Sequence, residues 1–357
     1  MFRRFRKVLF GTVHNGQKAH LFIIKRKEIS FCVTDFGCTI TSLKIRDEKD
    51  SWTDVVLGME TLAGYASNWG SFGAVIGRYS NRINGASFEL KGKKISLSEN
   101  IEGACLHGGF PAWGNIIWNA KKVCKKNACG VCFWKEFKDG EQGFPGNLKV
   151  QVEYLIDDNK QLSMVFRATT DEETPISITN HSYFNLRGKD NVKDYELQLF
   201  ADRYIDLESS EKIKSVAGTD FDFTKKKRWW SESMLQANPD FKGYDICYAA
   251  TGYCGSKGIP LEGTPMVKIA EISDPISGRG MSVSSNQEGF QLYTGNYVRF
   301  TPGKEGRWYQ QNEGICIETQ SFPDSPNQES FPSVVLHPGE QYEARTVYAF
   351  YNDMKNR

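Results

Sequence analysis

Residues 148–170 read LKVQVEYLIDDNKQLSMVFRATT, and this stretch carries the clearest structural pattern in the chain. Apolar side chains occupy every second position on both sides of its centre, at Leu148, Val150, Val152, Tyr154 and Ile156 and again at Leu162, Met164, Phe166 and Ala168. Such alternation is typical of a β-strand with one buried face. The intervening Asp157-Asp158-Asn159-Lys160 supplies turn-forming residues. We therefore predict an antiparallel hairpin over residues 148–170.

The same two-residue period recurs along the rest of the chain. Ile29, Phe31 and Val33 alternate in this way, and residues 283–293 do so less regularly. The 33 glycines and 12 prolines divide the sequence into short segments, and no stretch of about 12 residues or more shows a strong helical period. The pattern predicts an all-β protein with few short helices.

The chain shows no break in composition, no linker and no repeat of fixed period. Large sandwiches can exceed 200 residues as one domain, so we predict a single domain over residues 1–357. Residues 225–265 are the least patterned part and begin with Lys225-Lys226-Lys227-Arg228. We interpret them as a long excursion over the surface next to a binding cleft, because long loops in compact domains are often functional.

The overall composition is that of a globular protein with a sizeable core, since 39% of the residues are hydrophobic and 25% are charged. A formal net charge of +2 gives no reason to expect a nucleic-acid partner. The basic start at residues 1–7 is not followed by the apolar region of a secretory signal. No run approaches the roughly 18 apolar residues of a membrane span. We therefore expect a cytoplasmic protein without a membrane partner.

The nine cysteines are odd in number and irregularly spaced, so we expect free buried thiols. Cys129-Gly130-Val131-Cys132 forms a C-x-x-C motif, but a zinc site needs four ligands. The later pair, Cys247 and Cys254, has the wrong spacing for such a site. A redox motif would require a βαβ context, whereas this one lies in a strand-like run.

Two of the five histidines lie in unusual surroundings. His107 is followed by two glycines, which allow the backbone to approach another group closely. His181 lies in the polar and aromatic run Asn-His-Ser-Tyr-Phe-Asn-Leu at residues 180–186. A buried structural histidine is the alternative interpretation of each. His14, His20 and His337 need only solvated or capping roles.

Glu318 follows the apolar run Ile315-Cys316-Ile317. A carboxylate is rarely buried without a partner, so one within such a strand is a candidate acid or base. Asp245 follows Gly243-Tyr244, and Arg82 lies between Asn81 and Ile83 as a candidate polar clamp. This set of histidine, glutamate, aspartate and arginine residues fits sugar chemistry, but it does not identify the reaction.

A set of sequence blocks resembles the aldose 1-epimerase (galactose mutarotase) family. Each block is short, but the blocks follow one another in the family's order from about residue 9 to the C-terminus. They are GRYSNRI at 77–83, LHGG at 106–109, DGEQGFPGNL at 139–148, NHSYFNL at 180–186, GYD at 243–245, QLYTGN at 291–296, ETQSFPD at 318–324, FPS at 331–333 and LHPGEQY at 336–342.

The resemblance implies one large antiparallel β-sandwich, a galactose mutarotase-like supersandwich, with a sugar cleft on its concave face. It implies that His181 is the general acid, that Glu318 is the general base and that His107 assists at the sugar. It further implies that the sugar hydroxyls are bound by Asn81, Arg82, Asp245 and Gln291. The expected substrates are free hexoses such as galactose and glucose, without cofactor or metal. We expect a monomer or a weak dimer.

Three positions depart from the family pattern. Ala112-Trp113-Gly114-Asn115 stands where the family commonly has Gly-Phe-Asp-Lys, and Ile246 stands where a histidine is usual. A Pro-x-Gly-Glu turn is missing near residues 210–215. We expect these changes to reshape the rim of the cleft and to affect sugar preference.

Three other functions compete with hexose epimerisation. A hexose-6-phosphate 1-epimerase would need a cationic clamp for the phosphate, which residues 225–228 could supply. A sugar-binding module that had lost catalysis would lack a proton-transfer residue, yet both His181 and Glu318 are present. A glycoside hydrolase usually uses two carboxylates, whereas the proposed pair is a histidine and a glutamate.

Overall fold

The computed structural model describes residues 4–67, 70–209, 211–251 and 258–352. In this part the chain forms 29 strands and two short α-helices, α1 Leu62–Ala66 and α2 Glu232–Ala237. The all-β prediction is therefore confirmed. None of the described helices has the length and apolar character needed to cross a membrane. Residues 1–3 of the basic N-terminal run, Cys254 and residues 252–257 of the unpatterned segment lie outside the described residues.

The predicted hairpin is confirmed at residues 148–170. Strand β13 Leu148–Asp157 pairs with β14 Gln161–Thr170, in a register that runs from Leu148 opposite Thr170 to Ile156 opposite Leu162. The apolar positions of both strands face a common core. Tyr154 lies at its centre, with the rings of Phe31, Phe133 and Phe166 about it at centroid distances of 6.1, 6.1 and 6.4 Å.

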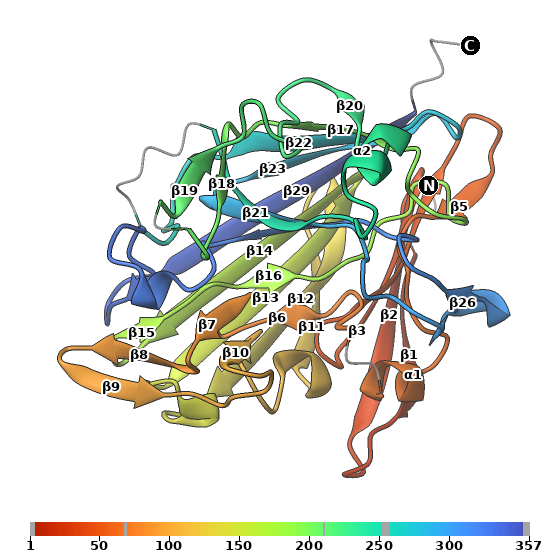
Figure 1. Ribbon diagram of the computed structural model, residues 1–357. Helices are drawn as coiled ribbons and strands as arrows, with labels where there is room; N and C mark the ends of the chain where they lie inside the picture. Colours follow the sequence, from red (N-terminus) through yellow and green to blue (C-terminus); the bar gives the residue numbers. More distant parts are fainter. Residues whose placement is uncertain (1–3, 68–69, 210, 252–257, 353–357) are drawn as a thin grey trace.

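The hairpin belongs to a nine-stranded antiparallel sheet, whose long strands run diagonally in Figure 1. Each strand pairs with its neighbour in the opposite direction. The order is β11 Asn119–Cys124, β12 Ala128–Phe137, β13, β14, β29 Tyr342–Asn352, β23 Arg279–Ser285, β22 Val267–Asp274, β17 Glu196–Leu199 and β20 Lys227–Arg228.

Two five-stranded antiparallel sheets form the opposite layer of the sandwich. One has the order β1 Arg4–Thr12, β2 Lys18–Lys25, β3 Ile29–Thr34, β4 Ile40–Arg46 and β5 Trp52–Asp54. The other has the order β19 Ile213–Ser215, β18 Arg203–Ile205, β21 Asp245–Ala249, β24 Gly289–Tyr293 and β27 Cys316–Gln320.

Contacts between the layers tie each five-stranded sheet to the nine-stranded one. Phe31 of β3 packs edge-on against Tyr154 of β13. The Tyr348 hydroxyl of β29 donates to the Ile317 carbonyl of β27 at 2.8 Å. The fold is thus the large antiparallel β-sandwich that the family resemblance predicted.

Residues 180–186, which we call the joining segment, bridge the two five-stranded sheets. Phe184 and Ile315 exchange backbone hydrogen bonds of 2.7 and 2.9 Å just before β27. On the other side, the amide of Asn185 donates to the carbonyl of Val55, which follows β5, at 2.9 Å. The joining segment therefore closes the second layer and lies beside β27.

Several short strand pairs flank this layer. Figure 1 shows β6, β7, β10 and β16 lying in front of the nine-stranded sheet. The pairs are β6 Val75–Ile76 with β16 Thr179–Asn180, β7 Arg82–Asn84 with β10 Ala104–Leu106, β8 Ser87–Leu90 with β9 Lys93–Ser96, β15 Thr174–Pro175 with β28 Val335–Leu336 and β25 Thr301–Pro302 with β26 Trp308–Tyr309.

The interpretation of residues 225–265 as a surface excursion is wrong for much of the segment. Its described part contains β20, α2 and β21, and β21 lies in the interior of a five-stranded sheet. Trp229 is fully buried, and its indole N–H donates to the Val192 carbonyl at 2.7 Å. The strands and the helix in this segment are short, so its sequence contains no helical or alternating pattern that is long enough to recognise.

The expectation of free thiols is wrong for one pair of cysteines. Cys124 and Cys129 lie opposite one another in the β11–β12 pairing and form a disulfide. The C-x-x-C motif does not pair internally, since Cys132 is a free buried thiol. The other free cysteines of the described residues are Cys32, Cys38, Cys105, Cys247 and Cys316.

Truncating a side chain on the buried face of the hairpin should destabilise the protein far more than truncating one on its exposed face. We predict that Phe166→Ala lowers the free energy of unfolding by about 3–5 kcal/mol, the usual cost of removing a buried aromatic ring. Thr169→Ala, on the exposed face of the same strand, should change it by no more than about 0.5 kcal/mol. Urea unfolding measures both variants, and similar values would show that residues 161–170 do not have this orientation.

Candidate active site

The second five-stranded sheet arranges two rows of side chains on its outer face. Residues directly opposite in an antiparallel sheet point to the same side. Phe290, Leu292 and Ile317 point to the core, so their sequence neighbours point outward. One outward row contains Cys247, Gln291 and Glu318, and the next contains Asp245, Tyr293 and Cys316.

The joining segment brings His181 to these rows. The backbone amide of His181 donates to the Ala74 carbonyl at 2.9 Å, and its carbonyl accepts from Gly73 at 2.8 Å. Its ring stacks on Tyr183 with a centroid distance of 4.9 Å and an interplanar angle of 17°. These contacts place Nε2 of His181 3.7 Å from Oε1 of Glu318.

A second histidine enters from the β7–β10 pair. Asn81 and His107 both have positive φ angles, 63° and 55°, which are uncommon for residues other than glycine. The His107 amide donates to the Asn81 carbonyl at 2.8 Å, and the Asn81 amide donates to Nδ1 of His107 at 3.2 Å. Since Nδ1 accepts this hydrogen bond, the neutral ring carries its proton on Nε2.

Amide side chains connect the remaining predicted residues. Nδ2 of Asn81 donates to Oε1 of Gln291 at 3.1 Å, and Nε2 of Gln291 donates to Oδ1 of Asp245 at 2.7 Å. Oδ1 of Asn81 accepts from the Arg82 amide at 3.0 Å. Each amide is thereby held in one orientation.

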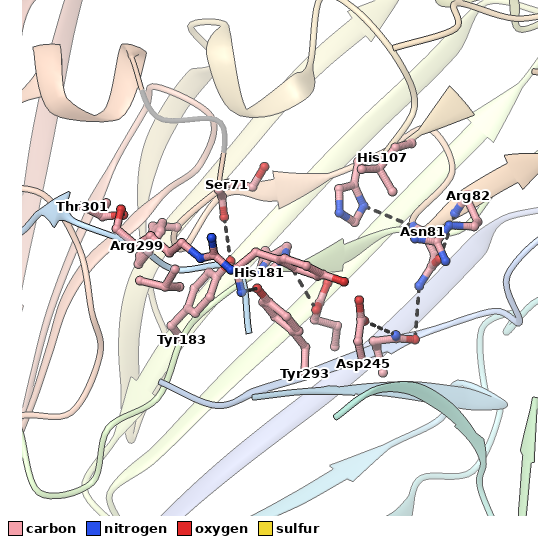
Figure 2. Close-up of a pocket in the computed structure, with 17 residues that line it drawn as sticks. Ser71, Asn81, Arg82, His107, His181, Tyr183, Asp245, Tyr293, Arg299 and Thr301 are labelled. Carbon is pink, nitrogen blue, oxygen red and sulfur yellow. Dashed lines mark hydrogen bonds and ion pairs between the residues drawn. The ribbon is translucent and has the colours of Figure 1, made fainter. Parts of the chain in front are cut away.

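All seven residues predicted from the sequence line one cavity of about 560 Å³. This volume is within the usual range of small-molecule pockets. Figure 2 shows His107, Asn81 and Asp245 towards one end and Arg299 and Thr301 towards the other, with His181 between them. Their catalytic and binding roles stay predictions.

Burial shifts the pKa values of the ionisable residues at the cavity. Loss of hydration lowers the pKa of His181 to about 4 and that of His107 to about 3, with a smaller effect on His107 from the positive charge of Arg82. Burial raises the pKa of Glu318 well above its ordinary value, and the nearby Asp245 carboxylate raises it further. Asp245 is exposed to the cavity, yet loss of hydration still raises its pKa, against smaller opposing effects of the Gln291 hydrogen bond and the Arg82 charge.

The pKa shifts oppose the formation of an ion pair between His181 and Glu318. Their separation of 3.7 Å exceeds hydrogen-bond length, and burial disfavours the charged form of each residue. Among the described residues, no hydrogen bond to the Glu318 carboxyl contributes to its pKa. Burial therefore favours a neutral pair, an uncharged imidazole and a protonated carboxyl, in which the one proton is carried by Glu318.

One group of side chains has the composition of a metal site. Candidate ligand atoms of His181, Cys316 and Glu318 lie within 4.8 Å of one another. However, Nδ1 of the imidazole faces Cys316 and Nε2 faces Glu318. One ion cannot bind both ring nitrogens, so the observed orientation suits two separate contacts of the histidine better than a shared metal.

The positions that depart from the family pattern lie outside the main cavity. Ala112, Trp113, Gly114 and Asn115 line an adjoining cavity of about 270 Å³, and Trp113 is also buried against Phe137. Ile246 lines a third cavity of about 330 Å³. The changes therefore alter the spaces beside the predicted sugar cleft, and none of these five residues is among its described walls.

The basic residues considered as a phosphate clamp lie elsewhere. Lys225–Arg228 are exposed, and the last two form the edge strand β20 of the nine-stranded sheet. Arg187 forms a two-pronged pair with Asp274, and Arg279 donates to the Leu186 carbonyl. The arginines among the described cavity walls are Arg82 and Arg299.

Sequence reasoning missed four residues at the site. Tyr183 and Tyr293 lie within quoted blocks but were given no role, although their rings pack against His181. In the sequence Cys316 is only one member of an apolar run. Arg299 belongs to none of the quoted blocks, so no sequence signal singles it out. A further correction concerns His20, whose Nδ1 contacts the buried Asp35 carboxylate at 2.8 Å.

Comparison with known proteins gives consistent matches over most of the chain. The sequence pattern of the aldose 1-epimerase family matches residues 20–349. Galactose mutarotase of Mus musculus is 35% identical over 353 residues, covering 96% of this chain and 98% of that protein. Aldose 1-epimerase of Escherichia coli K12 is 32% identical over 346 residues, covering 94% and 96% respectively.

Solved structures also resemble the fold. An aldose epimerase homologue from C. elegans superimposes with a TM-score of 0.80 at 26% identity, covering 92% of this chain and 97% of its own. Galactose 1-epimerase of Lactobacillus acidophilus gives a TM-score of 0.82 at 22% identity, with 98% and 99% covered. The second match bears on the fold alone.

The turn that carries His107 should tolerate no side chain at the next position. Gly108 has a φ of +84°, and a Cβ there would overlap the carbonyl oxygen of Gly77. We predict that Gly108→Ala lowers the free energy of unfolding by more than the roughly 1–2 kcal/mol that a left-handed conformation costs. Gly92→Ala is the matched control, because Gly92 has a φ of +71° and no atom near its Cβ position. Equal losses in urea unfolding would contradict the steric account.

Proposed function

The chain belongs to the aldose 1-epimerase family, and on this premise we propose that it interconverts the α and β anomers of free hexoses through Glu318 and His181. Members of the family are isomerases, and so is this protein. Galactose and glucose are the proposed substrates. The proposal goes beyond the family assignment by naming the sugars and the two proton-transfer residues.

The observation that carries the proposal is the position of Glu318 against His181 on the cavity wall. The two groups lie 3.7 Å apart, each is more than 90% buried, and both open onto the same cavity. A base and an acid at this separation can act on two neighbouring oxygens of one small molecule. The anomeric hydroxyl and the ring oxygen of a cyclic hexose, both bonded to C1, are such a pair.

The proposed reaction opens the hemiacetal ring and closes it on the other face of C1. Glu318, as a carboxylate, takes the proton of the anomeric hydroxyl while His181, as an imidazolium, protonates the ring oxygen, so that the bond between C1 and this oxygen breaks. Rotation about the C1–C2 bond presents the other face of the aldehyde. The reverse transfers then close the ring and restore both groups.

The one proton held by His181 and Glu318 together is enough to produce both charges that the reaction needs at its start. Transfer of this proton from Glu318 to His181 gives the carboxylate and the imidazolium that ring opening requires. Burial favours the neutral arrangement in the free protein, and hydrogen bonds from sugar hydroxyls would stabilise the charged one. No net proton needs to enter from solvent.

The other predicted residues suit the recognition of neutral hydroxyls. His107 offers an Nε2–H donor whose low pKa keeps the ring neutral. Asp245 offers acceptor oxygens, while Asn81 and Gln291 hold one another in place. Arg82 adds a guanidinium donor at the cavity wall. Buried hydrogen-bonding groups of this kind discriminate strongly against ligands that leave them unpaired.

Free hexoses fit these surroundings better than hexose phosphates. A phosphate monoester carries about −1.5 to −2 charges at neutral pH and is usually bound by clustered Arg or Lys residues. The basic run at residues 225–228 is absent from the described cavity walls, and Arg187 is engaged by Asp274. A preference for glucose 6-phosphate would therefore count against the proposal.

Removal of either proton-transfer group should greatly reduce turnover. We predict that His181→Ala and Glu318→Gln each lower kcat by roughly 10²–10⁴-fold, the usual contribution of a general acid or base. Polarimetry of freshly dissolved α-galactose, α-glucose and glucose 6-phosphate measures the effect. Lys226→Gln, in the exposed basic run, is the control and should keep wild-type kcat on the free sugars. Near-normal kcat in either active-site variant would overturn the assignment.

The pH dependence should reflect the shifted pKa values. The active pair holds one proton, so activity is lost at low pH when His181 also becomes protonated and at high pH when Glu318 loses its proton. Because the pKa of His181 is lowered to about 4, we predict that kcat/KM for galactose stays constant down to about pH 4. Circular dichroism at each pH checks that the protein is folded. An acid limb near the ordinary histidine value of 6.5 would contradict this prediction.

A further inference from the structure

Cys316 lies directly behind the catalytic histidine. Its Sγ is 3.6 Å from Nδ1 of His181, within the range of hydrogen bonds to sulfur. Both side chains are buried, and Cys316 is 0% exposed. Because Cys316 precedes Glu318 by two positions on β27, its side chain lies on the same face of the strand as the glutamate.

The two nitrogens of the His181 ring therefore face different surroundings. Nε2 faces Glu318 and the cavity, whereas the side chain that contacts Nδ1 is Cys316. The ring also has a hydrogen bond to the backbone of His181 itself. Tyr183 stacks along the ring and keeps it from turning over. A histidine that takes and gives a proton through Nε2 must keep its other proton on Nδ1 throughout the cycle.

We propose that Cys316 is a positioning residue, whose sulfur accepts a hydrogen bond from Nδ1–H of His181 and so reserves Nε2 for proton exchange with the sugar. The proposal rests on the function proposed above, because it gives His181 the role of acid. Cys316 itself is absent from the described walls of the main cavity, so it acts through the histidine.

The choice of sulfur has a physical consequence. Burial raises the pKa of the Cys316 thiol well above its ordinary value, so the side chain stays uncharged. A carboxylate behind the ring would place another acidic group beside Glu318 and Asp245, whose pKa values are already raised. A neutral and weak acceptor orients the proton without adding this repulsion.

The opposite hydrogen bond is the alternative that must be tested. A thiol can also donate, and S–H donation to Nδ1 would place the ring proton of neutral His181 on Nε2. Nitrogen-15 NMR of histidine-labelled protein distinguishes the two, because protonated and unprotonated ring nitrogens have different chemical shifts. The His181 signals are assigned by their absence from a His181→Asn sample. At neutral pH we expect protonated Nδ1 and unprotonated Nε2 in the wild type.

Kinetics of Cys316 variants provide the second measurement. In Cys316→Ala we expect a mixture of tautomers and a kcat for galactose about 10-fold lower, near the low end of the loss seen when histidine metal ligands lose an orienting partner. KM should be unchanged. Cys316→Ser keeps an acceptor and should recover part of the lost kcat. Cys247→Ala, a buried cysteine in the neighbouring row of the same sheet face, should behave as the wild type.

Several outcomes would overturn the proposal. These are a wild-type proton on Nε2, an unchanged tautomer or kcat in Cys316→Ala, or a serine variant no better than alanine. If alanine prevents folding, the wild-type spectrum and the serine variant still decide the question. Failure of the proposed function is distinguishable, because His181→Ala would then keep near-normal kcat, whereas failure of this inference leaves the loss in His181→Ala intact.

Discussion

The site depends on the insertion of the joining segment between two β-sheets. Residues 180–186 bond to Ile315 on one side and to Val55 on the other, so they complete a layer that would otherwise be open. This constraint fixes the backbone of His181 beside β27, and the two-residue period of β27 directs Glu318 to the same cavity. The distance between His181 and Glu318 is therefore a consequence of sheet pairing.

Burial then gives this pair its chemical character. The same dry surroundings lower the pKa of His181 and raise that of Glu318, so that the order of their ordinary values, 6.5 and 4.5, is reversed and the carboxyl holds a proton more tightly than the imidazole. In water the proton would reside on histidine at acidic pH and glutamate would be ionised. Within the protein burial favours the proton on Glu318, and the proposed reaction requires hydrogen bonds from the sugar to move it to His181.

The sequence was sufficient for the hairpin at 148–170 because one face of each strand is buried and the alternation is long. It was insufficient for residues 225–265, where β21 is only five residues long and Trp229 is buried although it lies outside any strand or helix. His181 and Glu318 could be named because they lie in distinctive blocks. Cys316 could not, since an apolar run gives no sign that one member lies behind a histidine that is 135 positions away in the chain.

The central claim is that Glu318 and His181 share one proton at neutral pH. Infrared difference spectroscopy of the wild type against Glu318→Gln tests it most directly, with Asp245→Asn as the control for the neighbouring carboxyl. The account predicts a protonated carboxylic acid band that disappears in Glu318→Gln and persists in Asp245→Asn. An ionised Glu318 in the free protein at pH 7, with the band absent or assigned to Asp245, would contradict it.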